Sequence, residues 1–187
     1  MSTQRLNIYV KGGADATSTP LLPGSNMNAA GAWSRAIVAD GRHETSTYGE
    51  GVYGPDLAKV GAAQLQVLPT TRQIVVTIPA AVLGGVDLAT AGYQVSIFSD
   101  ADDGEGIGNI RPVYSLDCWN ANGCPTFIKP FRFGGGAGVW DPNLPTVDSD
   151  TSDPNAIDVI SGSAAQSEVL SWTSGAPVVV PYVGITP

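Results

Sequence analysis

Charged side chains are scarce in this sequence, and basic ones are the scarcest. Lys and Arg number nine against 17 Asp and Glu, which gives a formal net charge of −8 with only 14% of the residues charged. Such a chain would repel a phosphate backbone instead of neutralising it, and an anionic membrane surface is disfavoured on the same ground. Nucleic-acid binding is therefore not expected, and the polar surface must consist largely of Ser, Thr, Asn and Gln.

Long apolar runs are also missing. Runs such as "VVV" at 178–180 fall far short of the roughly 20 residues that a membrane-spanning helix requires. Met1 is followed by polar residues, so no signal peptide is visible. Because other features favour secretion, we expect an excised module of a larger secreted protein, with Met1 added by cloning.

Only two cysteines and one histidine, His43, are present. Cys118 and Cys124 flank the short loop "WNANG", and a disulfide across so small a loop would contribute roughly 2 to 3 kcal/mol. A disulfide is the favoured interpretation and implies an oxidising compartment. A pair of buried free thiols is the alternative, while a zinc site would need ligands that one histidine cannot supply.

The same scarcity limits catalysis. A Ser-His-Asp or Cys-His mechanism has little material, because there is one histidine and no G-x-S-x-G motif. Two carboxylates suffice for glycoside hydrolysis, and 17 acidic residues offer many pairs. A glycosidase therefore stays the minor alternative.

What the chain does contain is glycine (23) and proline (14) between short alternating segments. Residues 5–10 alternate Leu6, Ile8 and Val10 with other side chains, the period of two of a strand that buries one face. The other expected elements are strands at 32–40, 92–100, 111–116, 127–133 and 176–183, a hairpin at 63–79, a helical turn at 80–85 and a long loop at 11–31. This pattern predicts an all-β fold, an antiparallel β-sandwich with long loops, in a single domain spanning 1–187.

Three consecutive glycines at 134–136 follow the segment "FIKPFRF". No Lys-Ser/Thr pair comes after them, and "AGVWDPN" does not begin a helix that could point its N-terminus at a phosphate. The glycines are therefore interpreted as a bend or bulge after a strand.

Two loops are rich in carboxylates, the type of ligand that calcium prefers. The first holds Asp100, Asp102, Asp103 and Glu105. The second holds Asp148, Asp150, Asp153 and Asp158. The first does not follow the spacing of an EF-hand, and a solvated acidic turn is the alternative for each. Together they predict a possible calcium cofactor and no other.

Aromatic residues make up only 7% of the chain, which makes their place in loops informative. A flat ring in a loop can stack on a sugar, while nearby Asp, Asn or Arg side chains bind the hydroxyls. Trp33 lies beside "AIV" and is expected in the core instead. The candidates for carbohydrate binding are Trp119, Trp140, Tyr53, Tyr48 and Arg111.

Several segments in order carry a family resemblance. They are "IYVKGG", "LLPGSNMNAAGAWSRAIVADG", "RQIVVTIPAAVLGG", "GYQVSIFSD", "IRPVYS", "FRFGGG", "DPNAIDVISG" and "QSEVLSW". Their succession resembles the C-terminal domain of glucodextranases and some pullulanase-type enzymes, which is similar to DOMON domains and family 9 carbohydrate-binding modules. The resemblance spans about residues 5 to 183, and "FRFGGG" and "PNAIDVI" are its most specific parts.

The resemblance implies a β-sandwich carried by a secreted or cell-wall-attached amylolytic enzyme. Such a module binds α-glucan or cell-surface polysaccharide and performs no chemistry itself, so its partners would be the polysaccharide and an upstream catalytic domain. It also implies that the triple glycine is a backbone feature near the rim of the sandwich. The alternative function is a structural domain that anchors to a cell surface or assembles by strand pairing.

The sequence departs from this family in one respect. Such domains usually begin with an Asp-Asp-Gly-Pro-Gly stretch and further strands ahead of the segment that matches "RLNIYV", and these are absent. An unpaired central strand would be an aggregation hazard. We therefore expect the missing strands to come from a partner, a neighbouring copy or an upstream segment.

Overall fold

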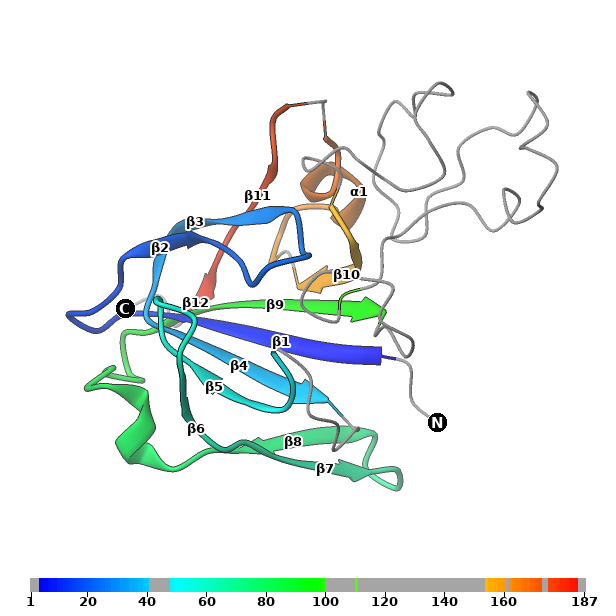
Figure 1. The fold of residues 1–187 in the computed structure, drawn as a ribbon. Helices are drawn as coiled ribbons and strands as arrows, with labels where there is room; N and C mark the ends of the chain where they lie inside the picture. The colour runs from blue at the N-terminus through cyan, green and yellow to red at the C-terminus, as the bar shows by residue number, and fades with distance from the viewer. Residues whose placement is uncertain are drawn as a thin grey trace, which may run out of the picture.

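The strands of the protein form three layers (Figure 1). The structure is a computed structural model that describes residues 4–40, 48–99, 110, 154–160, 162–172 and 175–184. A large sheet lies between a three-stranded sheet and a two-stranded hairpin, as Figure 1 shows from top to bottom. The predicted all-β sandwich is confirmed, with the hairpin as an additional layer.

The large sheet contains seven strands in the order β10-β9-β1-β4-β5-β6, with β12 also paired to β9. Their bounds are β10 (Ala156–Ile160), β9 (Gly92–Ser99), β1 (Gln4–Lys11), β4 (Arg35–Asp40), β5 (Gly51–Tyr53), β6 (Lys59–Gly61) and β12 (Val183–Gly184). The three-stranded sheet has the order β11 (Val178–Val180), β3 (Met27–Trp33) and β2 (Ser18–Pro20). The hairpin joins β7 (Gln64–Leu68) to β8 (Gln73–Thr77). The described residues also form two short helices, η1 (Ala80–Leu83) and α1 (Gln166–Val169).

Strand β1 lies inside the large sheet. It pairs antiparallel with β4 on one side, where Ile8 is opposite Ile37, and with β9 on the other, where Ile8 is opposite Val95. The expectation that β1 needs a strand donated by a partner is therefore wrong. Both of its edges are already satisfied by strands of its own chain.

The two faces of β1 are buried in an unexpected order. Arg5, Asn7 and Tyr9 are each 0% exposed, whereas Leu6 and Ile8 stay half-buried. The first three point to the inner face of the large sheet, which we define as the face turned toward the three-stranded sheet. The period of two was right, but the face with the polar side chains is the more deeply buried one.

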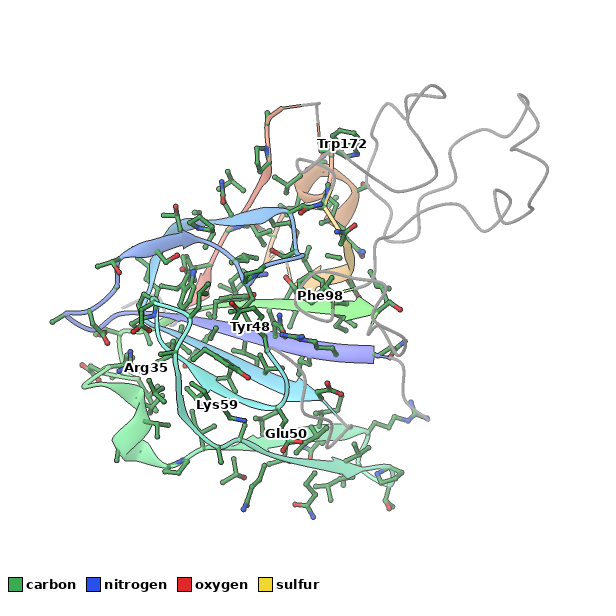
Figure 2. All side chains as sticks on the ribbon, viewed as in Figure 1. Arg35, Tyr48, Glu50, Lys59, Phe98 and Trp172 are labelled. Atoms are coloured by element: carbon green, nitrogen blue, oxygen red, sulfur yellow. The ribbon has the colours of Figure 1, made fainter. Side chains whose placement is uncertain are left out.

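The inner face forms the main core together with the three-stranded sheet and the segment around α1. Trp33 lies there as predicted and is fully buried. Its ring meets that of Tyr9 edge-to-face with 5.6 Å between the ring centroids, and its indole N–H donates to the carbonyl of Pro20 at 2.8 Å. The buried apolar members include Leu22, Met27, Val38, Phe98, Leu170, Trp172 and Val180. Figure 2 shows Phe98 on β9 and Trp172 beside α1.

The outer face, turned toward the hairpin, has a smaller core of Val10, Ile37, Val52, Ala63, Val86 and Ala91. Arg35 fastens this layer, because its Nε donates to the carbonyl of Val82 at 2.6 Å and its Nη1 to Asp15 at 2.5 Å. At Gly84, where φ is 65°, a Cβ atom would overlap the Arg35 guanidinium. The glycine therefore lets η1 end against this side chain.

The segment 11–31 is not the uninterrupted loop that we expected. It contains β2 and most of β3, and the single strand expected at 32–40 is divided at Ser34 between two sheets. The hydroxyl of Ser34 donates to the carbonyl of Val10 at 3.1 Å, which fixes this division. The strand "MNAAGAW" is too rich in small residues to show a period of two.

The remaining strand predictions have mixed outcomes. The hairpin at 63–79, the helical turn at 80–85 and the strand at 92–100 are confirmed, the last over Gly92–Ser99. The last predicted strand is split by Pro181 into β11 and β12, and β11 pairs with β3 in parallel, not antiparallel. The strands expected at 111–116 and 127–133 and the glycines at 134–136 lie outside the described residues.

Candidate functional site

The structure describes two of the residues predicted to bind carbohydrate, Tyr48 and Tyr53. The other candidates lie outside the described residues, and their roles stay predictions. They are Trp119, Trp140 and Arg111 for the sugar, Asp100, Asp102, Asp103 and Glu105 for calcium, and Cys118 and Cys124 for the disulfide.

Tyr48 and Tyr53 are in direct contact at the β5 side of the sandwich. Their ring centroids are 5.7 Å apart and their planes meet at 69°, an edge-to-face arrangement. Tyr53 is only 4% exposed, and its hydroxyl donates to the carbonyl of Gly49 at 2.8 Å. Tyr48 is half-buried and packs against the main core.

The burial of the two rings limits which of them could bind carbohydrate. The ring of Tyr53 has almost no free face, so it supports Tyr48 from within the core. Burial raises the pKa of Tyr53, which keeps its hydroxyl protonated as the donor to Gly49. Of these two tyrosines, Tyr48 alone has an exposed part that could stack on a sugar.

Hydrogen bonds hold the backbone that follows Tyr48, before and after β5. Lys59 Nζ donates to the carbonyl of Glu50 at 2.6 Å, and the two residues are labelled close together in Figure 2. Beyond β5, the backbone N–H of Gly54 donates to Ala58 O and that of Leu57 to Gly54 O, both at 2.9 Å. These contacts fix the backbone on either side of Tyr53.

Leu57 occupies the left-handed region in this turn, with a φ of 66°. A bulky residue is strained there, and glycine is the usual choice at this position of a hairpin loop. Leu57 is half-buried and packs against the main core near the tyrosines. Packing of its side chain thus offsets the backbone strain.

A buried row of polar side chains runs along the inner face of β1. Arg5 Nε donates to Asn7 Oδ1 at 2.9 Å, and Asn7 Nδ2 donates to the hydroxyl of Tyr9 at 3.3 Å. The same hydroxyl accepts the backbone N–H of Leu22 at 2.9 Å, from the loop that connects β2 to β3. The row therefore links two layers by directional bonds.

The pKa of Tyr9 is raised from 10.0 to about 12. Burial is the main cause, while hydrogen bonds from Leu22 and Asn7 and the charge of Arg5 act in the opposite direction. Burial likewise raises the pKa of Tyr53, and the charge of Arg5 offsets part of that rise. Sequence reasoning missed the row, because nothing local marks the polar side of "RLNIYV" as buried.

A second aromatic corner was also missed. The ring of Tyr182 lies 5.6 Å from Lys11 Nζ, a cation–π distance, and its hydroxyl donates to the carbonyl of Gly31 at 2.9 Å. Burial raises the pKa of Tyr182 to about 12. Since Tyr182 follows Pro181 in a segment expected to be a plain strand, no local signal separated it from its neighbours.

Metal ligands do not gather in the part of the chain that the structure describes, where no three His, Cys, Asp or Glu side chains come together. Asp158, from the second acidic segment, is exposed on β10 and accepts the backbone N–H of Val159 at 2.7 Å. The other members of that segment, Asp148, Asp150 and Asp153, lie outside the described residues. The calcium prediction thus depends on residues that the structure does not describe.

Comparison with known proteins adds one match. A search of curated proteins finds no match to the chain. Among the described helices, none is long and apolar enough to cross a membrane. A family model described as the C-terminal, SLH-like binding module of glucodextranase matches residues 1–180. That range includes every strand except β12. The chain therefore belongs to the family of C-terminal, SLH-like binding modules of glucodextranase.

Proposed function

We propose that the chain is a noncatalytic carbohydrate-binding module that holds a secreted amylolytic enzyme on α-glucan or on cell-surface polysaccharide. The match of a binding-module family over residues 1–180 carries this proposal. A C-terminal module of this kind acts beside a catalytic domain, which supplies the hydrolytic chemistry. An extracellular or cell-surface location follows from the same role.

Tyr48 supports the proposal from the side of structure. Its ring is held from beneath by Tyr53, so a sugar that stacks on it would meet a platform already in place. Trp119, Trp140 and Arg111 are proposed as the other contacts. Calcium at the acidic loop of Asp100 to Glu105 and a Cys118–Cys124 disulfide are proposed as supports for these loops.

Isothermal titration against a panel of α-glucans, dextran and pullulan included, in calcium-containing buffer tests the function. Saturable heat with one of them supports the proposal and names the substrate. Silence across the panel from a folded protein would contradict it and favour surface anchoring or assembly, while release of reducing ends would reveal a glycosidase.

Substitutions then locate the site. Trp119→Ala and Trp140→Ala should each weaken binding by roughly 1 to 3 kcal/mol, the scale of an aromatic hot spot. Tyr48→Ala should weaken it as well, whereas Tyr93→Ala is a matched control, because Tyr93 is half-buried on the outer face of β9. Equal affinity in all four variants would contradict the placement of the platform.

The two supports have separate tests. Bound calcium stabilises only the folded state, so a chelator should lower the melting temperature. Thiol titration of the unfolded protein should detect no free thiol before reduction and two after it. An unchanged melting temperature would remove the calcium proposal, and two free thiols before reduction would remove the disulfide.

A further inference from the structure

The hairpin β7–β8 is a two-stranded sheet of its own. Gln64 is opposite Thr77 and Leu68 is opposite Gln73, so the two strands pair along their whole length. Among the described strands, no third one joins either of them. Each strand therefore keeps an outward row of backbone N–H and C=O groups, which is a template for another strand.

The hairpin lacks the devices that normally protect such an edge. Neither "QLQVL" nor "QIVVT" contains a charge, a proline or a glycine. Val67 and Ile74 face each other across the hairpin, and each is 59% exposed. Charges, prolines and bulges usually prevent a second strand from pairing with an edge. The free edges of this hairpin contain none of these features, so another strand could pair with them.

Other edge strands of the molecule do carry these devices. β10 has a register irregularity between Ala156 and Asp158, and Asp158 adds an exposed charge. β2 ends in Pro20, and β6 begins with the exposed Lys59. The contrast shows that β7 and β8 are less protected against edge pairing than β10, β2 and β6.

We propose that β8 pairs antiparallel with β8 of a second copy of this chain, about a two-fold axis at Val75. In this register Gln73 lies opposite Thr77 of the second copy, and Ile74 lies opposite Val76. β8 is preferred over β7 because four of its five residues, 74–77, are β-branched and suit a strand edge. The pairing is independent of the carbohydrate-binding function.

Charge favours a second copy as the occupant. Two molecules of net charge −8 repel each other, so a contact between copies costs least at a surface that has no acidic residues. From residue 64 to residue 77 the only charged residue is Arg72, and in the proposed register it lies opposite Ile78, not opposite a second Arg72. The hairpin thus matches itself without opposing like charges.

The size of the contact sets its strength. A pair of five-residue strands buries well under the about 1,200 to 2,000 Å² of a stable interface. Association should therefore be weak in dilute solution and should appear as the local concentration rises. An enzyme displayed densely on a surface would reach such concentrations.

Sedimentation velocity from micromolar to millimolar protein, without sugar, tests the pairing. The wild type should form dimers at the high end, and Ile74→Lys should weaken dimerisation by more than about tenfold, because it places a charge within the new sheet. Ile160→Lys is the matched control, since Ile160 is an isoleucine on the edge strand β10 with 53% exposure. It should dimerise as the wild type does.

Two further measurements report the register and the edge. A mixture of Ile74→Lys and Ile74→Glu copies should regain dimers, because the two side chains are diagonal neighbours across the pairing. Hydrogen exchange in residues 73–77 should slow as concentration rises. Three outcomes would overturn the proposal. The wild type could stay monomeric at every concentration, or Ile160→Lys could abolish the dimers instead of Ile74→Lys. The third is the formation of open-ended filaments, which would indicate that β7 of one copy pairs with β8 of the next.

Discussion

The two faces of the large sheet differ in the chemistry of their side chains and in how deeply these are buried. On β1 and β9, the face with more polar side chains is the more deeply buried one. The inner face carries Arg5, Asn7, Gln94 and Ser96, yet all four are completely buried. The outer face is mainly aliphatic, but Leu6, Ile8, Val95 and Ile97 are only half-buried. Coverage by another layer therefore decides burial here, and hydrophobicity of the strand does not.

The energetic consequence is that each face is stabilised in its own way. The inner face depends on close packing and on buried hydrogen bonds, and the loss of one of these bonds leaves a polar group unpaired in the core, which is costly. The outer face depends on a hairpin fastened at η1 by Arg35. Substitutions should therefore have large effects on the inner face and graded effects on the outer one.

The largest expected effect comes from truncating adjacent residues of β9. Phe98 is fully buried on the inner face, and Phe98→Ala should lower the free energy of unfolding by about 3 to 5 kcal/mol. Ile97 points to the outer face and is half-buried, so Ile97→Ala should cost only about 1 to 2 kcal/mol. Urea denaturation followed by tryptophan fluorescence measures both. Equal losses would show that the outer face is as well covered as the inner.

The attachment of the hairpin layer can be tested at two neighbouring glycines. Gly84 and Gly85 both have positive φ, at 65° and 76°, but only at Gly84 would a Cβ meet the Arg35 guanidinium. Gly84→Ala should therefore destabilise by about 2 to 4 kcal/mol, and Gly85→Ala by about 1 kcal/mol from its backbone alone. Thermal unfolding of the two variants compares them. Similar melting temperatures would remove Arg35 as the fastening residue.

Removal of one hydroxyl tests the polar row of the inner face. Tyr9→Phe leaves the backbone N–H of Leu22 and one N–H of Asn7 without their acceptor, which should cost about 1 to 3 kcal/mol at neutral pH. The measurement is chemical denaturation at pH 7. A variant as stable as the wild type would mean that the row contributes no net stability.

The same variant has a signature at high pH. The pKa of Tyr9 is raised from 10.0 to about 12 in the folded protein, so folding favours the protonated hydroxyl. This contribution is fully present below pH 10 and is lost as the pH rises from 10 toward 12. Stability of the wild type should fall over this window, and Tyr9→Phe should show a smaller slope, with the remainder due to groups such as Tyr182.

The smallest effect is expected at the exposed end of the Arg35 contacts. Asp15 is 47% exposed, so its ion pair with Arg35 is screened by solvent. Asp15→Asn should cost at most about 1 kcal/mol, and the difference from the wild type should shrink in high salt. Melting temperatures at low and high salt measure it. A loss as large as that of Gly84→Ala would show that the carboxylate, and not the Val82 carbonyl, holds Arg35.

The elements predicted correctly from sequence are those with local signals. The hairpin has two β-rich runs around "PTTR", η1 follows Pro79, and β9 alternates along its length. The membership in the family was also visible in an ordered set of segments and is confirmed by the match over residues 1–180. Each of these signals is contained within a short stretch of chain or in the order of such stretches.

What failed depends on contacts between distant segments. Which side of β1 is buried depends on the three-stranded sheet of β2, β3 and β11 that covers it. The sequence of residues 5–10 carries no signal of that coverage. The contact of Tyr48 with Tyr53 could be expected from "TYGEGVYG", but the burial of Tyr53 could not, because it requires the layer packed above it. The same holds for the Lys11–Tyr182 pair, whose members are separated by most of the chain.

The parallel pairing of β11 with β3 has a consequence for how the protein is made. Val178 lies beside Met27 and Val180 beside Ala29, so the three-stranded sheet joins segments that are about 150 residues apart in the sequence. During synthesis the inner face of the large sheet cannot be fully covered until residues 178–180 have left the ribosome. From the synthesis of β1 to that of β11, the nascent chain must therefore keep its polar row and its aromatic core from wrong partners, and folding of the module waits for contacts of long range.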